Sequence, residues 1–88
     1  MDVNSTKKAS MQLAPNPATD EVFVTYNNTS SNSTIALYDL QGRSLANYPV
    51  ANATGVLTIA TNNYPSGVYI AVLRSNGTVV NQQKLIIK

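Results

Sequence analysis

Few side chains of this 88-residue chain could carry out chemistry. The sequence has no histidine and no cysteine, so the imidazole and thiol groups of the common nucleophile–base pairs are absent. Its acids are Asp2, Asp20, Glu21 and Asp39. Asp20 and Glu21 are adjacent, and neighbours on a strand point to opposite faces, so they cannot serve one substrate as acid and base. This inventory argues against an enzyme, and we predict no catalytic residue.

Asp39 stands in the segment Asp39-Leu40-Gln41-Gly42, where it could be considered as a calcium ligand. A calcium site needs roughly six to eight oxygen ligands, several of them carboxylates. A single acid beside a turn more often accepts hydrogen bonds from backbone N–H groups. We therefore predict that Asp39 shapes a turn, and we expect neither a metal site nor a cofactor. Gly42 is explained by the backbone freedom of glycine, without a bound phosphate.

Five tyrosines offer flat rings that could stack on sugars: Tyr26, Tyr38, Tyr48, Tyr64 and Tyr69. Tyrosine is also a good strand residue, whose ring is buried while its hydroxyl stays near water. We predict that Tyr26 and Tyr69, which fall within apolar runs, belong to the core. Tyr48 and Tyr64 stand beside prolines and are expected at the surface. A carbohydrate-binding platform therefore remains an open alternative.

Charge is scarce in this sequence, and the basic residues are scattered. Charged residues make up 11% of the chain, with a net charge of +2. A nucleic-acid-binding protein gathers Lys and Arg on one face, and a membrane-surface helix is basic and amphipathic. Neither pattern occurs, so we expect no nucleic-acid partner, and we expect no small-molecule substrate either. No apolar stretch approaches the roughly 20 residues that span a bilayer.

Apolar and β-branched residues fall into about seven short runs, separated by turn residues. The runs cover residues 11–14, 20–26, 33–40, 43–50, 56–59, 68–73 and 79–87. This spacing, without an amphipathic helix, is typical of an all-β fold, an immunoglobulin-like antiparallel β-sandwich of about seven strands. A small antiparallel barrel is the competing architecture. The polar residues 1–10 show no hydrophobic period and are interpreted as a leader, with the domain at 11–88.

Turn residues predict how the runs are connected. Pro15 and Pro17 end the first run, because proline has no N–H to donate to a neighbouring strand. Asn76-Gly77 predicts a type I′ hairpin turn, since both residues tolerate a positive φ. Gly42 is predicted to end a type I turn in the left-handed conformation. The polar residues 81–83 indicate a bulge in the last run.

The end of the sequence, Lys84-Leu85-Ile86-Ile87-Lys88, combines an apolar run with flanking cations. If this run forms an edge strand, its free N–H and C=O groups could add to the sheet of a partner. The lysines would then protect the edge until docking. Arg43, just past the hairpin glycine, either solvates an edge or contacts a partner.

Four segments occur in a fixed order along the chain. They are Pro15-Asn16-Pro17, Tyr38-Asp39-Leu40-Gln41-Gly42-Arg43, Ser66-Gly67-Val68-Tyr69 and the terminal segment 84–88. In this order, over residues 11–88, the chain resembles the type A C-terminal sorting domain of the type IX secretion system (the Por secretion system C-terminal sorting domain family). One departure is Tyr64-Pro65, where the family often has leucine or isoleucine before the Ser-Gly step.

The resemblance implies a secretion signal that directs a covalently fused upstream cargo across the outer membrane of a Gram-negative bacterium. The implied partners are the outer-membrane translocon, its shuttle protein, and a sortase-like cysteine protease that cleaves in or before residues 1–10. The cargo would reach the cell surface or be secreted.

The resemblance also assigns roles to residues. Positions that shape the fold would be Pro15, Asn16, Pro17, Tyr38, Asp39, Gly42, Gly67 and Tyr69. Candidates for contact with the translocon are Arg43, Lys84, Leu85, Ile86, Ile87 and Lys88. The alternative function is an appended β-sandwich module that binds carbohydrate or supports a neighbouring catalytic domain.

Overall fold

Seven strands account for most of the described chain. The computed structural model describes residues 9–27, 29, 32–50 and 52–88. The strands are β1 (Ser10–Ala14), β2 (Glu21–Asn27), β3 (Ser33–Asp39), β4 (Ser44–Val50), β5 (Gly55–Ala60), β6 (Gly67–Ser75) and β7 (Thr78–Ile87). The described residues contain no helix, and hence none that could cross a membrane.

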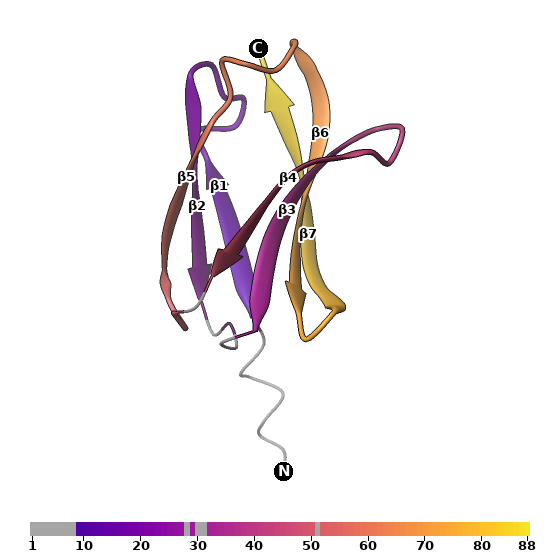
Figure 1. Cartoon of the computed structure of the whole chain (residues 1–88). Coiled ribbons are helices and arrows are strands. Elements are labelled where there is room, and N and C mark those ends of the chain that lie inside the picture. The colour runs from indigo at the N-terminus through magenta and orange to yellow at the C-terminus, as the bar shows by residue number, and fades with distance from the viewer. Residues whose placement is uncertain (1–8, 28, 30–31, 51) are drawn as a thin grey trace.

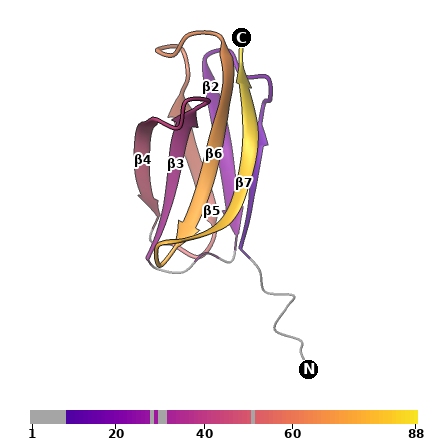
Figure 2. The same cartoon turned by 90° about the vertical axis from the view of Figure 1, so that its right-hand side faces the viewer.

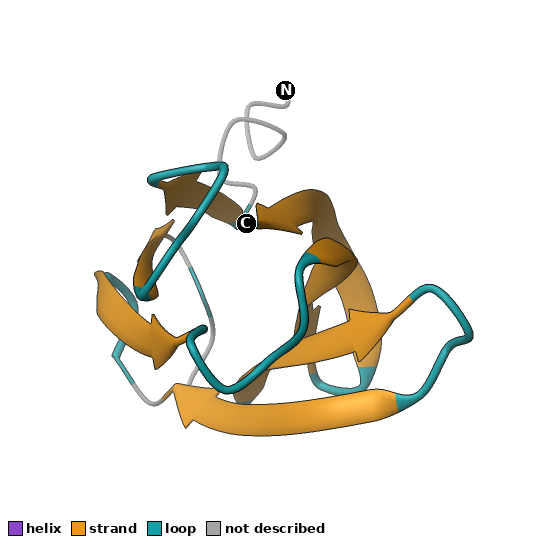
Figure 3. Ribbon diagram, turned by 90° about the horizontal axis from the view of Figure 1, so that it is seen from above, coloured by secondary structure: helices purple, strands orange, loops and turns teal. Residues whose placement is uncertain are grey.

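The strands form two antiparallel sheets, which pack as the two layers visible in Figures 1 and 3. One sheet has the order β1-β2-β5 and the other the order β4-β3-β6-β7. This confirms the predicted seven-stranded sandwich over the barrel. In the constant-type immunoglobulin arrangement the fourth strand belongs to the first sheet, whereas here β4 pairs with β3 in the second.

The core follows from the alternation of apolar residues along the strands. In β2, the side chains of Val22, Val24 and Tyr26 are buried, whereas Phe23 on the opposite face remains 40% exposed. The facing sheet contributes further buried side chains, among them Ile35, Leu37, Leu73, Leu85 and Ile87. Burying a side chain of this size contributes about 1.5–3 kcal/mol. This apolar layer therefore supplies the stability of a chain without disulfides.

Two hairpin turns adopt the predicted geometry. Asn76 and Gly77 have φ values of 53° and 83°, as a type I′ turn requires. Gly42, at φ 87°, is the left-handed residue of the turn between β3 and β4. The predicted bulge in β7 is confirmed and lies directly before the polar residues 81–83. Leu73 pairs with Asn81 and Arg74 with Val79, so the extra residue is Val80.

The polar side chain of Gln83 has another explanation than a bulge. Its Nε2 donates a hydrogen bond to the backbone oxygen of Met11 in β1. Gln83 therefore joins the edge of one sheet to the edge of the other, and its polarity does not mark an irregular strand.

The direction of the strands decides which connections lie together. Figure 1 shows the C-terminus at the upper end of the sandwich. The connections β1–β2, β3–β4 and β5–β6 lie at this same end, and β1 begins at the opposite end.

Candidate recognition site

The four segments singled out from the sequence meet at one end of the sandwich. We call this surface the motif end and define it as residues 15–18, 38–43, 65–69 and 84–88. Strand pairing joins its parts, because Tyr69 pairs with Asp39 on one side and with Leu85 on the other. Segments that are separated by long stretches of sequence thus form one continuous surface.

Asn16 acts as a substitute peptide unit between two prolines. Its Nδ2 donates to the carbonyl oxygen of Lys84 at 2.9 Å, and its Oδ1 accepts from the N–H of Ile86 at 3.0 Å. Pro15 and Pro17 have no N–H to donate, so the side-chain amide of Asn16 supplies the missing donor, and its oxygen adds an acceptor beside it. Both peptide bonds that precede these prolines are cis.

Ala18 continues the same pairing with its backbone. Its N–H donates to the oxygen of Ile86 at 2.7 Å, and its oxygen accepts from the N–H of Lys88 at 2.8 Å. Together, Asn16 and Ala18 cover the outer edge of β7 from the carbonyl of Lys84 to the N–H of Lys88.

This pairing corrects one expectation about the terminal strand. β7 does lie at the edge of its sheet, but the edge groups that strand addition would use between Lys84 and Lys88 are already bonded. The prediction of free N–H and C=O groups there was wrong. It treated Pro15 and Pro17 only as the end of a strand. An amide side chain placed between two prolines was the signal that could have indicated a second role.

Asp39 organises the turn between β3 and β4. Its Oδ1 accepts hydrogen bonds from the N–H groups of Gln41 and Arg43, each at 3.0 Å. Its Oδ2 accepts from Nε of Arg43 at 2.7 Å. The prediction that Asp39 caps backbone groups is therefore confirmed.

The electrostatics of this turn favour the ionised carboxylate. The backbone N–H of Arg43 has the largest effect and lowers the pKa of Asp39 below its usual value, helped by the Arg43 guanidinium and the Gln41 N–H and opposed by desolvation. The Asp39 side chain is only 12% exposed, whereas that of Arg43 is 75% exposed. The arginine is held at Nε but remains accessible. Its role in contact with a partner stays a prediction.

Tyr69 fixes the loop that enters β6. Its hydroxyl donates to the backbone oxygen of Pro65, four residues earlier, at 2.6 Å. This arrangement corresponds to the tyrosine corner of immunoglobulin-like sandwiches, in which a tyrosine near the start of the sixth strand bonds to the backbone upstream. Gly67 begins β6 within this loop. The corner explains why Pro65 and Tyr69 occur at this spacing.

The predicted positions of the tyrosines were correct for two and wrong for two. Tyr26 and Tyr69 are buried in the core, as expected. Tyr48 and Tyr64 are half-buried and pack against the core, whereas we expected them at the surface. The ring centroids of Tyr64 and Tyr69 lie 6.0 Å apart. Burial also raises the pKa of Tyr48.

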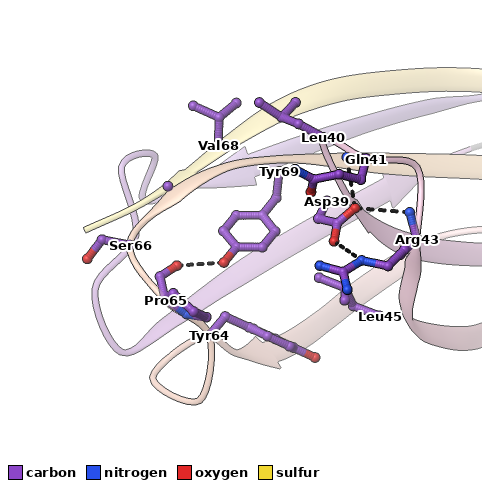
Figure 4. A pocket seen from close by; sticks show the side chains of 11 residues that line it. Asp39, Leu40, Gln41, Arg43, Leu45, Tyr64, Pro65, Ser66, Val68 and Tyr69 are labelled. Atoms are coloured by element: carbon purple, nitrogen blue, oxygen red, sulfur yellow. Dashed lines mark hydrogen bonds and ion pairs between the residues drawn. The ribbon is translucent and has the colours of Figure 1, made fainter.

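A shallow hollow of about 380 Å³ separates the hairpin from the tyrosine corner (Figure 4). Its lining includes Asp39, Arg43, Leu45, Tyr64 and Tyr69. The acid is paired with the arginine and the Tyr69 hydroxyl is bonded to Pro65. No group of three His, Cys, Asp or Glu residues that could hold a metal occurs in the described part of the chain.

Comparison with known proteins gives one family. The sequence model of the family described as "Secretion system C-terminal sorting domain" matches residues 12–88. No curated protein matches the chain. The matched range includes all seven strands except the first residues of β1, and it contains every segment of the motif end.

Proposed function

Because the chain belongs to the family of type IX secretion system C-terminal sorting domains, we propose that the export machinery recognises it at the motif end. Members of this family are C-terminal secretion signals, and this is the function of the domain. A signal of this kind leads to export to the cell surface or to secretion from Gram-negative bacteria. The family is not catalytic, and a carbohydrate-binding or supporting module is not favoured.

The convergence of the four segments carries this proposal. Asn16 and Ile86 are 70 positions apart in sequence and directly bonded in the fold. A receptor that contacts the motif end therefore recognises the folded domain. An unfolded chain would present the same residues far apart from one another.

The orientation of the chain also supports recognition at this end. β1 begins at Ser10, at the end of the sandwich opposite to the motif end (Figure 1). A polypeptide that precedes β1 leaves the domain on that side, so a fused cargo would not shield the motif end. We infer that residues 1–10 form the junction with the cargo, although residues 1–8 lie outside the described part of the chain.

Burial divides the terminal segment into contact residues and core residues. Leu85 and Ile87 are 0% and 2% exposed, so they act through the fold. Lys84 and Lys88 are exposed and form no ion pair with other described residues. We assign contact with the translocon or its shuttle protein to Arg43, Lys84, Lys88 and the half-buried Ile86. A sortase-like cysteine protease would act at the opposite end, in or before residues 1–10.

An export assay tests this proposal. The chain is fused behind a periplasm-targeted fluorescent reporter in a bacterium with the type IX system. We expect export of the wild-type fusion to require the translocon. We expect the triple variant R43Q/K84Q/K88Q to be exported about tenfold less, because it can no longer make charged hydrogen bonds to the receptor.

The matched control is T25E/N52E/T58E, which lowers the net charge by the same amount at exposed positions away from the motif end. It should be exported normally. Equal retention of the wild-type fusion with and without the translocon would refute sorting, and normal export of the triple variant would refute recognition at the motif end.

A further inference from the structure

The four-stranded sheet has an outward surface that is more apolar than a solvent-facing sheet usually is. Figure 2 shows this sheet toward the viewer, in the order β4-β3-β6-β7. Tyr38 pairs with Ile70 and Ile70 with Lys84, and these three side chains alternate with the core residues of their strands. Val72 and Arg74 continue the same row along β6. We call this surface the outer face.

Some apolar side chains of the outer face are buried although they point away from the core between the two sheets. Ala36 and Val72, which pair with each other, are only 1% and 6% exposed. An antiparallel sheet with one solvated face normally alternates apolar residues inward with polar residues outward. Here β6 carries apolar side chains on both faces, although only one face packs against the other sheet.

A hollow of about 400 Å³ lies over Val72 on the outer face. It is bordered by Leu40, Tyr38, Ile70, Val72, Val79 and Gln82. Leu40 is 65% exposed and Val79 is 46% exposed, so two large apolar side chains stand open at its margin. The hollow reaches Asp39 and Gly42, which connects the outer face to the motif end.

Arg74 is held in a fixed position at this surface. Its Nη1 donates to the hydroxyl of Tyr38 at 2.7 Å, and its Cζ lies 5.4 Å from the centre of the Tyr38 ring. No carboxylate of the described residues is paired with it. A guanidinium that is positioned in this way can bind a carboxylate in a two-point geometry.

In the described part of the chain, the charged residues are unevenly distributed between the two sheets. The basic residues are Arg43, Arg74, Lys84 and Lys88, and all lie on β6, on β7 or its end, or in the turn before β4. Among the described acids, Asp39 is paired with Arg43, and Asp20 and Glu21 lie at the start of β2 in the other sheet. The four-stranded sheet is therefore the positive side of this part of the molecule.

We propose that the outer face docks an apolar protein surface bordered by carboxylates, carried by a component of the type IX machinery. The proposal rests on the sorting function and adds a second contact surface next to the motif end. Its apolar centre supplies contact area, and its cations select a partner with acids at the corresponding positions. Two copies packed face to face would instead bring like charges together.

Export of matched variants tests this surface. Val79→Glu introduces a carboxylate on the outer face directly opposite Arg74, where the two can pair across the strands, so the fold is preserved. The new carboxylate would occupy Arg74 and repel the acids of the partner. The control is Val56→Glu, at a position that is 62% exposed on the other sheet. We expect V79E to reduce export of the reporter fusion about tenfold, and V56E to leave it unchanged, at equal thermal stability.

A crosslinking measurement does not depend on how V79E folds. A photoreactive amino acid at position 79 should crosslink to a protein of the machinery during export, and one at position 56 should not. Docking at the outer face is refuted if wild-type export needs the translocon but V79E is exported normally. It is also refuted if crosslinks form equally from both positions. In either case the sorting function itself is not contradicted. If wild-type export does not need the translocon, sorting itself fails.

Two other occupants are separate outcomes, and either would overturn the proposal. One is a dimer of the purified chain that V79E dissociates, measured by sedimentation. The other is binding of the chain to anionic phospholipid vesicles that Arg74→Gln abolishes.

Discussion

The N–H of Ile86 donates a hydrogen bond to the side-chain oxygen of Asn16, 70 residues earlier, at 3.0 Å. The same side chain donates to the carbonyl of Lys84. Since Pro15 and Pro17 cannot donate, this amide replaces a peptide unit along the edge of β7. The Pro-Asn-Pro segment is therefore both the end of β1 and a cover for the terminal strand.

Asn16→Ala should expose the edge of β7. The variant removes the partners of Ile86 N–H and Lys84 C=O, and we expect the free energy of unfolding to fall by about 1 kcal/mol, because water can replace exposed hydrogen bonds in part. Hydrogen exchange of the Ile86 amide should accelerate more than that of amides that face β6. The control is Asn63→Ala, at an exposed position of the loop before β6. Unchanged exchange at Ile86 would contradict the assigned role of Asn16.

The strands could be predicted from the sequence, but the contacts that cover the sheet edges could not. Alternation in β2 and the Asn76-Gly77 turn depend on local preferences, which are visible in a few consecutive residues. The contacts of Asn16 with Ile86 and of Gln83 with Met11 join segments that local patterns do not relate. Tyr48 was predicted at the surface because Pro49 follows it, yet packing across the sandwich half-buries it.

We expect the free energy of unfolding to fall in acid as Asp39 becomes protonated. The pKa of Asp39 is lowered in the fold, so its stabilising contribution is present above the unfolded value, about 3.8, and is lost as the pH falls through the lower, folded value. Asp39→Asn should remove this part of the pH dependence. Denaturant unfolding of wild type and variant at a series of pH values below neutrality measures it.

Arg43→Gln provides the comparison for this titration. It removes the guanidinium but keeps the backbone N–H of residue 43, which has the largest effect on the Asp39 pKa. We expect R43Q to retain part of the pH dependence that D39N loses. Identical slopes for D39N and wild type would exclude Asp39 as the responsible group.

The hydroxyl of Tyr69 should have a measurable effect on stability. Tyr69→Phe removes the bond to the Pro65 oxygen and leaves that acceptor partly buried, which costs about 1 kcal/mol. Tyr64→Phe is the matched control, because the Tyr64 hydroxyl makes no hydrogen bond to a described residue. Thermal unfolding should distinguish the two variants, and an equal effect of both would argue against the tyrosine corner.

Gly55 is required by the tyrosine that packs over it. A Cβ atom at position 55 would lie 2.6 Å from the hydroxyl oxygen of Tyr26 and 2.9 Å from its Cζ. We expect Gly55→Ala to lower the free energy of unfolding by about 1–3 kcal/mol, because the Tyr26 ring must move within the packed core. Adding Tyr26→Phe removes the closest clash, so the double variant should recover part of the loss. Strictly additive effects would show that the two residues do not interact.

The terminal segment allows folding and recognition to be separated. Leu85 and Ile87 are core residues, so L85A/I87A should lose about 2–5 kcal/mol for each substitution, which is comparable to the whole stability of a small domain. This variant should be unfolded and retained in the periplasm. K84A/K88A changes exposed positions on β7 and just after its end, and it should unfold at the wild-type temperature.

The export of K84A/K88A then decides what the machinery requires. If the motif end is the recognised surface, a folded K84A/K88A fusion should remain in the periplasm. If only a folded sandwich is required, it should be exported as wild type, because the buried face of β7 is unchanged. Circular dichroism of the purified domain and fluorescence of the medium provide the two measurements for each variant. A folded and fully exported K84A/K88A variant would exclude the two lysines from recognition.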